Sequence, residues 1–146
     1  MTTADRVAIV EEMVALPFSE EGDASGGARY GLRVLLASRD FWDDRSEEIV
    51  EAAEEEIDAA LRELVAALTA RWGEPESIDL EPYLWAESPA PEPIQTLCGL
   101  SGKMLVWQRP DAGRWLALAV GQADPEFPIQ LLAAVGEAPI PAAGDE

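Results

Sequence analysis

The stretch "GKMLVWQRPDAGRWLALAVG", residues 102–121, decides the fold class. Two short, mostly apolar runs flank Pro-Asp-Ala-Gly at residues 110–113, and this tetrapeptide is typical of a tight turn. Two strand-like runs joined in this way predict a β-hairpin. The protein is therefore expected to contain an antiparallel sheet.

Both faces of the predicted hairpin are apolar. If Arg109 pairs with Arg114, successive side chains alternate between the two faces. One face then carries Leu105, Trp107, Leu116 and Leu118, and the other carries Met104, Val106, Trp115, Ala117 and Ala119. Both faces must be covered. Helices are expected on one face, where the small Ala117 and Ala119 suit a closely packed long helix. A second subunit on the other face would make a homodimer.

The segment from Asp44 to Gly73 predicts a long helix. Asp44 followed by Glu47 resembles a capping box, and Gly73 followed by Pro75 is a typical stop. Apolar residues spaced by three, four or seven predict a buried stripe made of Val50, Ala53, Ile57, Leu61, Leu64, Leu68 and Trp72. Such a helix is about 40 Å long, whereas a compact domain of this size has a radius of gyration of about 15 Å. Its acidic N-terminal half is therefore expected to overhang the core.

The other periodic segments predict one more helix and three more strands. Residues 3–16 predict the helix, and residues 29–39, 77–85 and 124–135 predict the strands. A helix is the alternative for residues 29–39, because Leu35 breaks the alternation. Pro82 marks a bend or an edge in the second of these strands. The proline-rich segment 88–102 predicts a connection with no more than one short helical turn.

Together these elements predict a single α+β domain over residues 1–146. The N-terminal helix and the long acidic amphipathic helix are expected to pack on a mainly antiparallel sheet of about four to five strands. The glycine-rich acidic segment 19–28 is expected to be a mobile loop, and residues 138–146 a flexible C-terminal tail.

The composition is strongly acidic. Ten lysine and arginine residues stand against 29 aspartate and glutamate residues, there is no histidine, and the formal net charge is −19. A field of this sign repels phosphate groups, so we expect no nucleic-acid partner and no membrane association. Basic proteins would be attracted, although a large net charge also serves solubility alone.

The residue inventory argues against several kinds of site. Without histidine, the Ser-His-Asp and Cys-His arrangements are impossible within this chain. The single cysteine, Cys98, allows no disulfide within the chain and no thiolate zinc cluster, and we expect it to be a small buried residue. "GLSG" and "SGKM" around Ser101 lack residues that a nucleophile elbow and a phosphate loop require. We therefore expect no cofactor and no bound metal.

The N-terminal segment does not resemble a targeting sequence. Residues 1–16 include Asp5, Arg6, Glu11 and Glu12, so the basic and then apolar order of a signal peptide is missing. No apolar run approaches the roughly 20 residues of a membrane span. A cytoplasmic location is therefore expected.

A stripe of carboxylates follows the long predicted helix. Its members are Glu47, Glu51, Glu54, Glu55 and Asp58. Like charges three or four residues apart repel, and Asp58 with Arg62 is the only favourable pair. The simplest explanation is a solvated helix face. The alternative is a docking surface, with the neighbouring Trp42 as an aromatic anchor.

Two functional hypotheses follow from these residues. The leading one is a non-catalytic protein-binding module, with a chaperone, adaptor or inhibitor role, whose acidic stripe and Trp42 meet a basic protein. The alternative is a histidine-free enzyme or small-ligand-binding domain with carboxylates and arginines in a pocket between sheet and helix. The first candidates for that pocket are Glu81, Tyr83, Trp107, Arg109 and Arg114.

Overall fold

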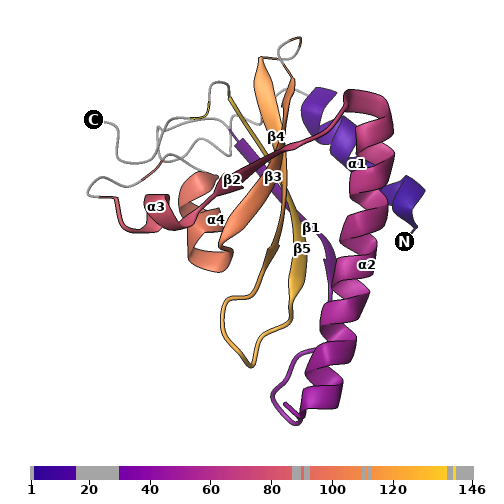
Figure 1. Cartoon of the computed structure of the whole chain (residues 1–146), viewed down its shortest axis with the longest axis vertical. Helices are drawn as coiled ribbons and strands as arrows, with labels where there is room; N and C mark the ends of the chain where they lie inside the picture. The colour runs from indigo at the N-terminus through magenta and orange to yellow at the C-terminus, as the bar shows by residue number, and fades with distance from the viewer. Residues whose placement is uncertain are drawn as a thin grey trace.

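The computed structural model describes residues 2–15, 30–86, 90, 93–109, 111, 113–137 and 140. Within these residues the chain forms helices on both sides of one sheet (Figure 1). The elements in chain order are α1 (Thr3–Ala15), β1 (Tyr30–Ala37), α2 (Glu47–Trp72), β2 (Glu76–Asp79), α3 (Glu81–Leu84), α4 (Ile94–Leu100), β3 (Lys103–Arg109), β4 (Arg114–Gly121) and β5 (Gln130–Glu137).

The sheet has five strands in the order β1-β5-β4-β3-β2, and every neighbouring pair is antiparallel. Residues of α1 and α2 form one hydrophobic cluster with one face of the sheet, and residues of α3 and α4 form a second cluster with the opposite face (Figure 1). The predicted α+β fold with helices packed on an antiparallel sheet is confirmed.

The hairpin has the predicted register, because Arg109 lies opposite Arg114. Trp107 packs in the cluster with α1 and α2, whereas Trp115 and Ala117 pack in the cluster with α3 and α4. The long helix thus packs on the face opposite to the one predicted, since the small alanines face the α4 side. Most apolar side chains on both hairpin faces are buried within the described part of the chain, whereas Leu105 and Val120 are partly exposed. The expected homodimer remains a prediction.

The stop of α2 is confirmed, and its predicted start is wrong. Gly73 has a φ of 89°, and its N–H donates to the Thr69 oxygen at 2.9 Å. Ser46, and not Asp44, is the residue directly before the helix. The Asp44 carboxylate instead accepts the Ser46 N–H at 2.9 Å, and hydrogen bonds from Ser46 lower the pKa of Asp44.

The N-terminal half of α2 does not overhang the core. Ala53 and Ile57 are only 5% and 1% exposed, as the stripe predicted, and Ala60 is buried as well. The core extends under this half because Phe41, 1% exposed, packs beneath it. The Phe41 N–H donates to the Glu126 oxygen at 2.8 Å, which joins the segment before α2 to the connection between β4 and β5.

Two segments between α2 and β3 are more helical than predicted. Only residues 76–79 form a strand, and the chain then enters the short helix α3 with Pro82 in its first turn. The fixed φ of proline suits that position. Further along, α4 replaces the predicted connection, because Ile94, Leu97 and Cys98 form a buried helical face against the sheet.

Two predictions lie outside the described residues: the mobile loop at 19–28, and the flexible tail at 138–146 apart from Ile140. None of the helices in the described part of the chain combines the length and the apolar character that crossing a membrane requires.

Candidate functional site

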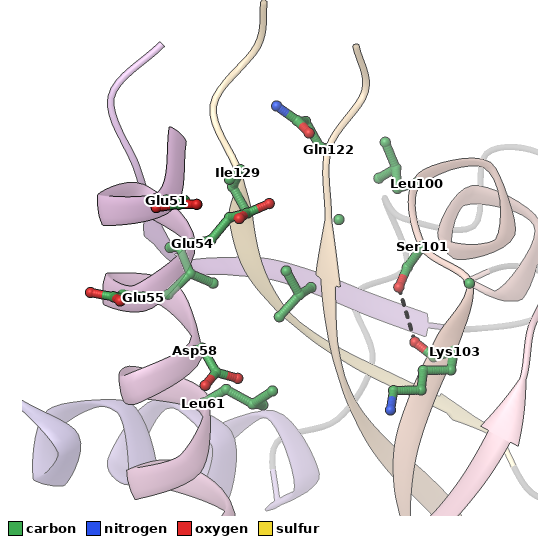
Figure 2. Close-up of a pocket in the computed structure, with 14 residues that line it drawn as sticks. Glu51, Glu54, Glu55, Asp58, Leu61, Leu100, Ser101, Lys103, Gln122 and Ile129 are labelled. Carbon is green, nitrogen blue, oxygen red and sulfur yellow. Dashed lines mark hydrogen bonds between the residues drawn. The ribbon is translucent and has the colours of Figure 1, made fainter. Parts of the chain in front are cut away.

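An open groove of about 870 Å³ lies between the N-terminal half of α2 and the neighbouring ends of β3 and β4 (Figure 2). We call it the acidic groove. It is lined by Glu51, Glu54, Glu55, Ile57, Asp58 and Leu61 of α2, by residues 100–103 where α4 leads into β3, by residues 120–122 at the end of β4, and by Ile129.

One wall of the acidic groove is a row of carboxylates on α2. Glu51, Glu54 and Asp58 are exposed and recur every three or four residues, so they lie on one side of the helix. Figure 2 shows Glu54 and Asp58 extending from α2 toward the strands, whereas Glu55 extends from the far side of the helix. Arg62 forms an exposed ion pair with Asp58 at 3.1 Å, a kind of contact worth about 0–1 kcal/mol.

The floor of the acidic groove is apolar. Ile57 and Ile129 are buried beneath it, and Leu61, Leu100 and Val120 are partly exposed. Val120 lies on the same face of β4 as the buried residues at 116 and 118, because side chains alternate along a strand. The floor is therefore the partly exposed end of a sheet face whose other residues are buried beneath the helices.

The opposite wall is built by the turn from α4 into β3 and by the end of β4. The Gln122 N–H donates to the Leu100 oxygen at 3.1 Å, which ties the two segments together. The Ser101 hydroxyl donates to the Lys103 backbone oxygen at 3.0 Å, as the dashed line in Figure 2 marks. Lys103 is the only cationic side chain among the lining residues, so the groove carries a net negative charge.

An exposed aromatic pair lies next to the acidic groove. The rings of Trp42 and Phe127 are tilted against each other with centroids 5.3 Å apart, and they are 60% and 38% exposed. Phe127 belongs to the connection between β4 and β5, which also contributes Gln122 and Ile129 to the groove. Glu47 is exposed in the first turn of α2 and does not line the groove.

The five residues of the alternative pocket do not come together. Glu81 and Tyr83 lie in α3, and Tyr83 is buried in the cluster on that side of the sheet, where burial raises its pKa. Trp107 is buried in the cluster on the opposite face. Arg109 and Arg114 lie opposite each other at the end of the hairpin.

Trp107, Arg109 and Arg114 hold the helix ends against the hairpin. The Trp107 indole N–H donates to the Gly73 oxygen at 2.8 Å, and its ring lies edge-on to Trp72 at 6.2 Å. The Arg109 guanidinium lies over the Trp72 ring, 4.6 Å from its centroid, and this geometry is a cation–π contact. Arg114 Nη1 donates to a backbone oxygen near the end of α1 at 3.0 Å.

The described residues offer few groups for covalent or metal chemistry. Cys98 is buried, as predicted, and its thiol donates to the Gln95 oxygen at 3.2 Å. No group of three carboxylates or thiols among the described residues is placed to hold a metal ion. The groove instead presents exposed carboxylates above an apolar floor, and this combination suits a ligand with cationic and apolar groups.

Sequence reasoning identified the acidic wall and missed the floor and the opposite wall. The alternation along β4 places Val120 with residues 116 and 118, so this position could have been assigned to the apolar face. The roles of Ser101, Lys103 and Gln122 depend on how α4 meets β4, and no local pattern encodes that contact.

Comparisons of the chain with models of protein families, with curated proteins and with solved structures found no match.

Proposed function

We propose that this protein is a non-catalytic binding module whose acidic groove takes a basic segment of a partner protein. The observation that carries the proposal is the combination of three exposed carboxylates, Glu51, Glu54 and Asp58, with an apolar floor along one open groove. Paired acidic and apolar surfaces favour polypeptides that carry both arginine or lysine and apolar side chains.

The electrostatics of the whole chain support the same proposal. A net charge of −19 draws basic proteins toward the molecule, and carboxylates along the groove would set the register of a bound segment. Among the residues that line the groove, Lys103 is the one cation that would oppose a basic partner, and a basic side chain that binds Asp58 would compete with its ion pair to Arg62. The exposed aromatic pair beside the groove adds apolar area of the kind enriched at interface hot spots.

Charge reversal in the groove is the first test. The variant Glu51→Lys, Glu54→Lys, Asp58→Lys is expected to weaken binding of a captured basic partner about 10- to 100-fold, since each exposed pair contributes about 0.2–1 kcal/mol. Partners are captured on the immobilised protein from a lysate of the source organism at low and moderate salt, identified by mass spectrometry, and their affinities then measured with purified components.

The matched control reverses the exposed residues Glu48, Glu56 and Glu74, which changes the net charge equally and leaves the groove lining intact. It is expected to retain most of the binding, because these side chains do not line the groove, and exposed charges that act on the bound segment only through solvent are screened at physiological salt. Equal loss in both variants would assign the binding to net charge alone and would overturn the proposal.

A substitution on the opposite wall is expected to strengthen binding. Lys103→Glu replaces the single cation of the groove lining by a further carboxylate, so the affinity for the same basic partner is expected to rise about two- to fivefold. Isothermal titration calorimetry at two salt concentrations measures the change. An unchanged or lower affinity would show that the bound segment does not pass between α2 and Lys103.

A further inference from the structure

We infer that the segment bound in the acidic groove is an amphipathic basic α-helix, which lies over β3 and β4 alongside the N-terminal half of α2. This inference rests on the proposed function and adds the conformation of the partner. Three observations carry it: the side of α2 that has no neighbouring helix among the described residues, the position of the groove over a face of the sheet, and the spacing of the carboxylates.

The first observation is the incomplete helix layer. α1 packs along the C-terminal half of α2, where the Thr3 hydroxyl donates to Glu63 at 2.7 Å and Arg71 pairs with Glu11 at 2.7 Å. Toward the N-terminus of α2, beyond Leu61, none of the described helices packs beside α2 on this side, and the acidic groove lies there instead (Figure 2). The strands under the groove lie about two strand spacings, or about 10 Å, from the strands under α2. The axes of packed helices are roughly 8–10 Å apart, so a helix in the groove would pack against α2.

The uncovered sheet face continues beyond this groove. A second hollow of about 340 Å³ shares Leu61, Lys103 and Val120 with it and extends over β3 and β4 as far as Asp79. It lies where the β3–β4 ladder ends, at Leu105 opposite Leu118. Together the two hollows leave the sheet face open from α2 across β4 and β3 to Asp79 at the end of β2.

The second observation is that the groove lies over a face of the sheet. The edges of the sheet are β1 and β2, and the strands that contribute most to the groove floor lie between them. An extended peptide binds best by adding to a sheet edge, which pairs its backbone N–H and C=O groups. Over an apolar floor those groups would stay unpaired, at a cost in free energy. A helix satisfies its own backbone groups and can lie on such a floor.

The third observation is the spacing of the carboxylates. Glu51, Glu54 and Asp58 recur at helical intervals and follow the axis of α2, about 5 Å apart. Lysines or arginines three or four residues apart on a neighbouring helix form a row with the same spacing. Leucines on the adjacent face of that helix would cover Leu61 and Val120. A second copy of this chain is a poor occupant, because each copy carries a net charge of −19.

Three synthetic peptides of identical length and charge test the inference. The first places leucines on one helical face and lysines three and four residues apart beside them. The second contains the same residues in strict alternation, which favours an extended strand. The third keeps the helical pattern but carries two central prolines, which prevent a continuous helix. Fluorescence polarisation measures each Kd, and circular dichroism measures helix content on binding.

The helical peptide is expected to bind at least tenfold more tightly than the other two and to gain helix content in the complex. Its binding is expected to be lost with the reversal of Glu51, Glu54 and Asp58 and kept with the reversal of Glu48, Glu56 and Glu74. Similar affinities for all three peptides, or tightest binding of the alternating one, would overturn the helical partner and leave the proposed function standing. Binding of no peptide, together with failure of groove reversal to affect captured proteins, would overturn both.

Discussion

Replacing Leu64 by alanine is expected to lower the free energy of unfolding by about 3–5 kcal/mol. Leu64 is 0% exposed at the centre of α2, where it packs in the cluster formed with α1 and the sheet. Truncation removes the burial of the side chain and leaves a cavity that the surrounding sheet and helix fill only in part. For a chain of this length the melting temperature is expected to fall by about 10–15 °C.

Urea denaturation followed by tryptophan fluorescence measures this change, with the m-value as a check on two-state unfolding. Arg62→Ala is the matched control on the same helix. It removes only the exposed pair with Asp58 and is expected to cost less than about 0.5 kcal/mol. A loss below about 1 kcal/mol for Leu64→Ala would contradict the packing of α2 on the sheet described here.

Adding a single methyl group at Gly136 is expected to destabilise the protein by about 1–3 kcal/mol. Gly136 lies directly opposite Trp115 on neighbouring strands, and a Cβ at this position would lie 2.6 Å from Cζ2 of the indole. The indole cannot move aside easily, because Trp115 is 2% exposed and its N–H donates to the Glu137 oxygen at 3.2 Å. Gly136→Ala must therefore shift either β4 or β5.

The control for this substitution is Gly99→Ala. Gly99 lies in α4, and a Cβ there has no atom within 4 Å. The alanine is expected to stabilise the helix by up to about 1 kcal/mol, because glycine is the less favourable residue inside a helix. Thermal unfolding and the near-ultraviolet circular dichroism of the tryptophans distinguish the two variants. Equal stability of both would show that Trp115 does not cover Gly136.

The way the sheet is covered explains why a binding groove can form on this fold. α2 lies over β5 and β1, and the end of α1 reaches the start of β4, so one face is fully covered only at the hairpin end. The other face is covered by α3 and α4. β4 must be as long as its neighbouring strands to pair with them. The apolar residues at its end therefore lie beyond the part of the sheet that the helices cover, beside the acidic side of α2.

Several features of the fold could be predicted from the sequence because they depend on neighbours in the chain. The hairpin around residues 110–113, its register at Arg109 and Arg114, and the stop of α2 at Gly73 each follow from local turn or cap chemistry. The buried stripe of α2 follows from the periodicity of apolar residues. The acidic wall could be located for the same reason, since carboxylates at helical spacing share a side of the helix.

Other predictions failed because they depend on which helix packs against which face of the sheet. The sequence alone did not indicate which hairpin face α2 covers, because both faces are apolar and either would gain from burial. The segment 88–102 contains three prolines, yet contact with the sheet stabilises α4 against this weak local preference.

The sequence by itself determined the α+β class, the two longest helices, the hairpin strands and the charge of the groove wall, because alternation, periodicity and turn residues act over a few positions. Only the tertiary structure decided that Glu54 and Asp58 face an apolar floor at Val120 and a wall at Lys103. Those residues are brought together by packing across the sheet, and the free energy of that packing depends on surfaces far apart in the chain.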